Sequence, residues 1–131
     1  MPGMMFQGEL KKNNSTVKVR LILFHFIDEN KVHILFSPHI DISGSGYSLY
    51  DAKKSFEIAL SDFFDYTIKK KTIKDLLKEY GWKFKENIKK PKEFKVPDIA
   101  DVIAKNKHVS EILNNYPVQT IHKDYNVPAF V

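Results

Sequence analysis

The stretch VKVRLILFHFIDENKVHILFSP, residues 17–38, decides the fold class. Apolar and charged side chains alternate at its start, which is the pattern of a strand with one buried face. From Ile22 onward both faces are apolar, as in a strand that enters the middle of a layered structure. Turn-forming residues at 28–31 separate it from a second alternating run at 32–38. The two runs predict an antiparallel hairpin, and Pro38 is expected to end its second strand or place it at an edge.

A long amphipathic helix is predicted over residues 49–68. Ser48 occupies the N-cap position, and Asp51 follows three residues later in a capping-box-like arrangement. Phe64 and Tyr66 lie partly off the apolar stripe, so they either widen the buried face or touch a partner. The stripe itself consists of Ala52, Phe56, Ala59, Leu60, Phe63 and Thr67.

The segments on either side of this helix contain turn-forming residues. Residues 39–48 hold two glycines and are interpreted as a flexible connection, with the SGSG sequence at 43–46 acting as a hinge at the sheet edge. On the other side, residues 69–82 restart a helical pattern. We expect Thr72 to cap this second, short helix and Gly81 to end it.

The rest of the chain mixes short helices and strands. A short extended segment is expected at 82–84, followed by a loop at 89–97. Two short helical pieces are predicted at 99–106 and 108–115. The tail at 118–131 alternates well enough to form one or two strands.

Together these elements predict an α+β fold within a single domain spanning residues 1–131, which is an ordinary length for one domain. We expect a small antiparallel sheet packed by one long and one short helix, with a mixed helical and strand C-terminal part. In this arrangement the helices cover one face of the sheet.

Residues 32–82 resemble the HicB-like antitoxin family. The resemblance rests on a strand ending in Pro38, a short loop to Gly46, a helix cap at Ser48 and Ala52 near the helix start. Gly46 lets the backbone turn from the sheet edge, and Ala52 lets the helix lie close to the sheet. The resemblance implies a degenerate ribonuclease-H-like fold.

The resemblance also implies a function. It places the HicB-like core at about residues 17–86 and leaves a C-terminal extension at about 97–131. Relatives neutralise a small toxin, HicA, and they usually form oligomers. Many also repress their own operon through an appended DNA-binding segment, whose pattern residues 97–131 do not match. The expected partners are therefore a second copy of the chain, with a dimer favoured, and a small basic HicA-like toxin.

The composition excludes several classes of protein. The chain has no cysteine, which rules out disulfide scaffolds, cysteine-ligated zinc, iron–sulfur clusters and thiol nucleophiles. No apolar run approaches the roughly 20 residues of a membrane span, and no signal peptide is visible. We therefore expect a soluble, cytoplasmic protein without a membrane partner.

The positive charge is concentrated in one segment. Residues 69–95 contain eleven lysines and four acidic residues, whereas the whole chain has a net charge of +5. Arg20 is the single arginine, and lysines attract polyanions without reading sequence well. A nucleic-acid surface would use Lys69, Lys70, Lys71, Lys74, Lys78 and Lys83.

Two interpretations of the lysine segment remain open. The aromatic residues Tyr80, Trp82 and Phe84 alternate with lysines, as in proteins that bind single strands by stacking and charge. Alternatively, these rings are core residues around the helix end and the lysines form a solvated surface. We favour the second interpretation.

The histidines do not predict a metal site. If the hairpin turn has two residues, Glu29 and Asn30, then His25 lies opposite Ile34 and His33 lies opposite Phe26. His25 and His33 would then point to opposite faces of the sheet, where they cannot share a ligand.

Catalytic motifs are equally weak. Asp41, Asp62 and Asp65 are the central candidates for a carboxylate triad, but the last two lie on the predicted solvent face of the long helix. The chain contains no GxSxG elbow and no glycine-rich phosphate loop. We therefore expect a non-enzymatic protein without a metal or cofactor.

The sequence supports two functional hypotheses. The first is a HicB-like protein that acts by protein–protein contact, as an antitoxin-type inhibitor or regulator. In this hypothesis, the sheet edge and the surface of the helix at 49–68 form an oligomer interface or cover a small basic partner. The alternative is a nucleic-acid-binding transcriptional regulator that uses the lysine-rich segment 69–95.

Overall fold

The structure is a computed structural model that describes residues 16–85 and 93–129. None of the helices in these two ranges is long and apolar enough to cross a membrane. The elements follow in the order β1 (Thr16–Ile27), β2 (His33–Ser37), β3 (Ile42–Gly46), α1 (Leu49–Lys69), α2 (Ile73–Glu79), β4 (Lys83–Lys85), β5 (Glu93–Lys95), α3 (Ile99–Lys105), α4 (Lys107–Asn115) and β6 (Gln119–Pro128).

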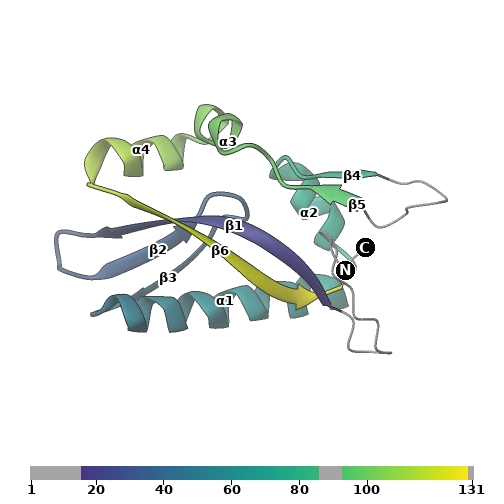
Figure 1. The fold of residues 1–131 in the computed structure, drawn as a ribbon, viewed down its shortest axis with the longest axis horizontal. Helices are drawn as coiled ribbons and strands as arrows, with labels where there is room; N and C mark the ends of the chain where they lie inside the picture. Colours follow the sequence, from purple (N-terminus) through teal and green to yellow (C-terminus); the bar gives the residue numbers. More distant parts are fainter. Residues whose placement is uncertain (1–15, 86–92, 130–131) are drawn as a thin grey trace.

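Four strands form one antiparallel sheet in the order β3-β2-β1-β6 (Figure 1). The long strand β1 lies in its interior and pairs with β2 on one side and β6 on the other. The short strands β4 and β5 form a separate two-stranded sheet. The predicted α+β fold is therefore confirmed.

Helices cover both faces of the four-stranded sheet, not one face as expected. Helix α1 lies on one face, and α3 and α4 lie on the other (Figure 1). The cause is already visible in β1, whose apolar residues after Ile22 point alternately to both faces. The face beneath α3 and α4 buries a cluster made of Phe24, Phe26, Phe36, Val102, Val109 and Ile112.

The larger core lies between α1 and the sheet. It buries alternate residues of β1 together with one side of α1, as the predicted helical stripe required. Of the two residues that lay off this stripe, Phe64 is buried and Tyr66 is exposed. The main side chains of this core are Val17, Val19, Leu21, Leu23, Leu35, Phe56, Leu60, Phe64, Leu77 and Trp82.

The hairpin turn is one residue longer than the sequence interpretation assumed. Asp28 donates its N–H to the carbonyl of Val32 at 3.0 Å, which leaves three residues in the loop. Lys31 takes the positive φ of 64° that this turn requires. The carboxylate of Asp28 accepts hydrogen bonds from Asn30 N–H and Val32 N–H, which fixes the loop. The register therefore shifts, and His25 lies opposite Leu35.

The stretch predicted as flexible, residues 39–48, contains the edge strand β3. Its glycines are required by packing and not by a hinge. A Cβ atom on Gly44 would overlap the backbone nitrogen of Phe56, and one on Gly46 would lie 2.5 Å from the Cβ atom of Asp51. Glycine thus lets the backbone of α1 lie directly against the sheet edge.

The helix ends follow the sequence signals in part. Ser48 caps α1 by accepting a hydrogen bond from Asp51 N–H, and Gly81 ends the α2 region with φ of 97°, as predicted. Thr72 precedes α2, but its side chain makes no capping hydrogen bond. Asn106, which was not singled out, caps α4 by accepting hydrogen bonds from His108 N–H and Val109 N–H.

The C-terminal part of the chain contributes to the same sheet. β6 pairs with β1 over ten residues, and Val127 is buried in the larger core. The predicted short helices correspond to α3 and α4, and the predicted tail strand corresponds to β6. The loop expected at 89–97 contains β5, while its residues 89–92 lie outside the described ranges.

Candidate functional site

Large apolar side chains gather on the outer side of α1. In the described part of the chain, five large hydrophobic residues are exposed, and four of them lie on α1 or directly before it. Tyr47, Tyr50, Ile58 and Tyr66 are between 63% and 82% exposed. Exposed tyrosines in one region are typical of protein-contact surfaces, because they combine a large apolar ring with a polar end.

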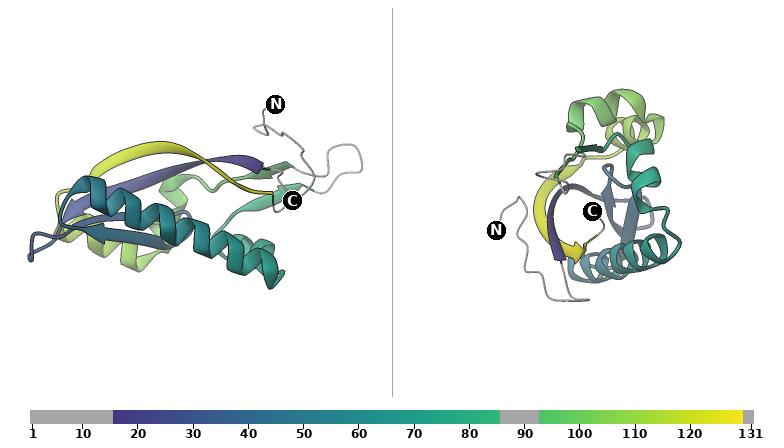
Figure 2. Two further views of the ribbon diagram at one scale, coloured as in Figure 1. Left: turned by 90° about the horizontal axis from the view of Figure 1, so that it is seen from below. Right: turned by 90° about the vertical axis from the view of Figure 1, so that its right-hand side faces the viewer.

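Three of these residues belong to one row along α1. Tyr50, Lys54, Ile58, Asp62 and Tyr66 follow one another at intervals of four residues, and we call this row the outer ridge of α1. Residues four apart are neighbours on a helix surface. Each step of four turns about 40° around the axis, so the row winds from Tyr50 on one flank, past Ile58 facing away from the sheet, to Tyr66 on the other flank. No other described element lies over this side of the helix (Figure 2). The outer ridge is thus available for contact.

Lysine ammonium groups lie beside two aromatic rings of the outer ridge. The ammonium group of Lys54 lies 5.3 Å from the centre of the Tyr50 ring, and that of Lys70 lies 5.8 Å from the centre of the Tyr66 ring. Each is a cation–π contact on the surface. Such contacts contribute about 0.5–1 kcal/mol each at exposed sites.

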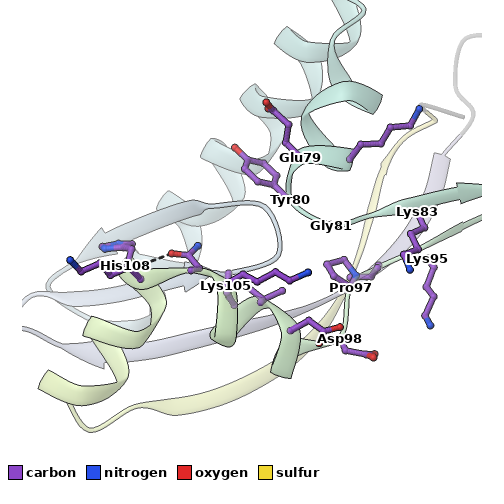
Figure 3. Close-up of a pocket in the computed structure, with 16 residues that line it drawn as sticks. Glu79, Tyr80, Gly81, Lys83, Lys95, Pro97, Asp98, Lys105 and His108 are labelled. Atoms are coloured by element: carbon purple, nitrogen blue, oxygen red, sulfur yellow. Dashed lines mark hydrogen bonds between the residues drawn. The ribbon is translucent and has the colours of Figure 1, made fainter.

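A second candidate site is a cavity of about 630 Å³ between α2 and the α3–α4 corner (Figure 3). This volume is within the range of small-molecule pockets. The lining residues come from the end of α2, both strands of the small sheet, the segment before α3, and α3 and α4. Its charged residues are Lys78, Lys83, Lys95, Lys105, Lys107, Glu79, Asp98 and Asp101.

The structure does not bring the six predicted nucleic-acid residues together. Lys78 and Lys83 line the cavity. Lys69, Lys70 and Lys71 lie at the end of α1 and in the turn that follows, away from the cavity lining.

Lys74 has a different environment, because it is half-buried and its ammonium group lies 5.9 Å from the centre of the Phe84 ring. Lys105 and Lys107, which also line the cavity, were not predicted. They follow segment 69–95 by ten and twelve residues, and the fold brings them to the same cavity.

The aromatic residues of the lysine segment are mainly core residues. Trp82 is buried and donates its indole N–H to the carbonyl of His39 at 2.9 Å. Phe84 is half-buried beside Phe94. Tyr80 lines the cavity, and its pKa is raised by burial and, to a smaller degree, by Asp41 and Glu79. Stacking of several bases on these rings is therefore not supported.

His39 follows Pro38 of the cavity lining, and its side chain is buried, with 3% exposed. Its Nδ1 atom accepts a hydrogen bond from Ile22 N–H at 3.4 Å, and its Nε2 atom has no hydrogen-bond partner. Burial lowers the pKa of His39, and the backbone of Pro97 opposes this shift. His39 therefore stays neutral at physiological pH and serves the structure as an acceptor.

The two hairpin histidines point to the same face, so the expectation that they point to opposite faces was wrong. The three-residue turn shifts the register, and His25 Nε2 lies 3.0 Å from His33 Nδ1. The rings are stacked, with centroids 5.2 Å apart, and His25 Nδ1 lies 3.4 Å from the side-chain oxygen of Gln119. Within residues 16–85 and 93–129, no three His, Cys, Asp or Glu side chains form a group that could hold a metal ion.

The carboxylate candidates and the residues of the HicB-like motif lie in turns, at the ends of strands or helices, or on the surface of α1. Asp41 lies in the turn before β3 with φ of 55°, and Asp62 and Asp65 lie on the exposed side of α1. Pro38 follows the last residue of β2, Gly46 ends β3, Ser48 caps α1, and Ala52 is buried at the first turn of α1.

Comparison with known proteins adds no relative. No protein-family model matches the chain, and no curated protein or solved structure matches it. The resemblance to HicB-like antitoxins therefore remains a prediction from the sequence.

Proposed function

We propose that this chain is a non-enzymatic, cytoplasmic protein that acts by protein–protein contact through the outer side of α1. The observation that carries this proposal is the gathering of Tyr47, Tyr50, Ile58 and Tyr66 on α1 or just before it, on surface that no other described element covers. Burying these side chains in a partner would remove a large apolar area from water, and tyrosines are frequent at the energetic centre of interfaces.

The charges beside the apolar residues favour a partner of mixed or positive charge. Asp51, Glu57, Asp62 and Asp65 are exposed on α1, and Lys54 and Lys69 are exposed with them. In the antitoxin-type form of the proposal, which follows from the HicB-like resemblance, the partner is a small basic toxin. In the regulator form, the contact assembles copies of the chain.

Site-specific photo-crosslinking in the native host tests the contact function. A photo-reactive amino acid replaces Tyr50, and a control carries it in place of Glu111, which is exposed on α4. We expect a discrete adduct from position 50 that disappears when Ile58→Asp is added, and no adduct from position 111. Equal labelling from both positions, or none from either, would contradict the proposal.

A second candidate function is nucleic-acid binding through the cavity lysines. The observation that favours it is the convergence of Lys78, Lys83, Lys95, Lys105 and Lys107 on one cavity, against three acidic residues. Lysines that neutralise phosphates release bound counterions, so the affinity should fall steeply with salt.

Fluorescence anisotropy with labelled single-stranded and duplex oligonucleotides tests this candidate. Lys83→Glu combined with Lys105→Glu should remove binding at about 50 mM salt. The matched control is Lys31→Glu in the hairpin loop, which changes the net charge in the same direction but lies outside the cavity lining. Absence of wild-type binding at this salt concentration would rule the candidate out.

A further inference from the structure

We propose that the outer ridge of α1 is a two-fold interface whose partner is a second copy of this chain. This inference rests on the proposed contact function and names its partner. Its basis is the order of residues along the ridge, which is Tyr50, Lys54, Ile58, Asp62 and Tyr66.

The outer ridge is chemically complementary to its own reversed copy. Ile58 lies at its centre, with Lys54 four residues before it and Asp62 four residues after it. A two-fold axis through Ile58 reverses the direction of the second helix. Lys54 of one copy then faces Asp62 of the other, and the same ion pair occurs twice because the interface is isologous.

The outer members of the ridge follow the same symmetry. Tyr50 and Tyr66 lie eight residues on either side of Ile58 and about 80° from it around the helix axis, so a reversed copy brings one tyrosine toward the other at the rim of the contact. Aromatic pairs contribute beyond the area they bury.

The spacing of the ridge determines how the two helices cross. Rows of residues four apart are ridges that pack side by side when two helices cross at roughly −50°. Helix α1 has 21 residues and is about 31 Å long, so the ridge spans most of its length. The crossing also separates Asp51 from Asp65 of the second copy. These two like charges would face each other if the helix axes were aligned.

A parallel arrangement of the two helices is disfavoured by the same charges. It would place Lys54 against Lys54 and Asp62 against Asp62, so attraction would become repulsion at both positions. A partner that is uniformly basic would leave Lys54 facing like charge. The antiparallel second copy is therefore the occupant that satisfies every charged position of the ridge.

Charge reversal with sedimentation equilibrium tests this geometry. Lys54→Asp and Asp62→Lys are made singly and together, and all variants are checked by circular dichroism because both positions are exposed. The wild-type chain should form a reversible dimer. Each single reversal should weaken it about 10-fold or more, because both ion pairs of the dimer become like-charge pairs.

Mixing the two single variants gives the decisive result. The Lys54→Asp chain carries two acids on the ridge and the Asp62→Lys chain carries two lysines, so the mixture should form a heterodimer close to wild-type affinity. The double variant should also regain the homodimer. A mixture that associates no better than its separate components would overturn the two-fold ridge.

The outcomes separate this inference from the contact function on which it rests. If the purified chain stays monomeric at millimolar concentration but position 50 still crosslinks to a different protein in the host, the contact function stands and the two-fold ridge is wrong. If Ile58→Asp abolishes self-association while the charge reversals have no effect, the contact surface stands and its antiparallel geometry is wrong. A monomer without any adduct overturns both.

Discussion

The two helical layers that cover the sheet differ on both their inner and outer sides. Helix α1 is one long helix that buries Phe56, Leu60 and Phe64 against the sheet, and its outer side carries exposed tyrosines. Helices α3 and α4 are short and bury three aliphatic residues in a smaller cluster. Their outer sides carry no large hydrophobic residue that is exposed.

This difference distinguishes a layer with one apolar side from a layer that also carries large apolar residues on its solvent side. A helix that covers a sheet needs one apolar side, and α3 and α4 meet that requirement alone. Helix α1 also has one apolar side against the sheet. In addition, it carries Tyr50, Ile58 and Tyr66 on its solvent-facing surface, where polar residues are usual. Because these side chains add nothing to the core, we infer that they are used for contact with another protein.

The largest expected effect is the loss of unfolding free energy caused by core substitutions on the inner sides of the two layers. Phe56→Ala should lower the free energy of unfolding by about 4 kcal/mol, because a large side chain that is fully buried leaves a cavity. Val109→Ala in the other layer should cost about 2 kcal/mol, because less apolar volume is lost. Urea denaturation of both variants measures the difference. Equal losses of unfolding free energy in the two variants would contradict the expectation that Phe56 contributes more to stability than Val109.

Close packing of α1 against the sheet edge predicts the next effect. Gly44→Ala should lower the free energy of unfolding by about 3 kcal/mol, because the new Cβ atom would overlap the backbone at Phe56. Ser43→Ala is the matched control on the exposed side of β3, and it should change stability by no more than about 0.5 kcal/mol. A tolerated Gly44→Ala would mean that α1 lies farther from β3.

The buried His39 predicts how stability depends on pH. Its pKa is lowered in the folded protein, whereas the unfolded chain takes up a proton at about pH 6.5. The unfolded state therefore binds more protons below this pH, and the free energy of unfolding should decrease as the pH falls below about 6.5.

His39→Asn tests the assignment of this pH dependence. The side-chain oxygen of the introduced asparagine can accept the hydrogen bond from Ile22 N–H, but the amide does not titrate. The variant should be less stable than the wild type at pH 7 and should show a flatter slope between pH 7 and pH 5. An unchanged slope would assign the pH dependence to other groups.

The sequence predicted those elements that have a local signal. The hairpin, the long capped helix, the short helix ended by Gly81 and the tail strand each follow from periodicity or turn residues, and all are present. The register of the hairpin did not follow, because it depends on Lys31 taking a positive φ in a three-residue loop. Strand β3 was missed because its glycines have low strand propensity and are explained by packing against α1.

The candidate sites were less predictable than the fold. Tyr66 could be identified as a residue that either packs or touches a partner, and the structure exposes it. Tyr50 and Ile58 had a usable signal, because they precede Tyr66 by sixteen and eight residues, both multiples of four, and lie off the apolar stripe of the helix. The presence of Lys105 and Lys107 in the same cavity lining as Lys83 had no local signal, because it arises from the way α3 and α4 pack on the sheet.

The smallest expected effect on stability belongs to the outer ridge. Ile58→Asp removes an exposed side chain from the middle of α1, so the free energy of unfolding at low concentration should change by no more than about 0.5 kcal/mol. A loss of several kcal/mol would show that Ile58 is part of the core of a single chain and not of a contact surface.

Self-association of the same variant tests the central claim most directly. Sedimentation velocity of the wild-type chain and of Ile58→Asp is compared over a range of concentrations, with Glu111→Lys on α4 as the matched surface control. The wild type and Glu111→Lys should shift toward a dimer as concentration rises, and Ile58→Asp should stay monomeric. If Ile58→Asp associates as well as the wild type, the outer ridge of α1 is not the surface through which this protein contacts a second copy.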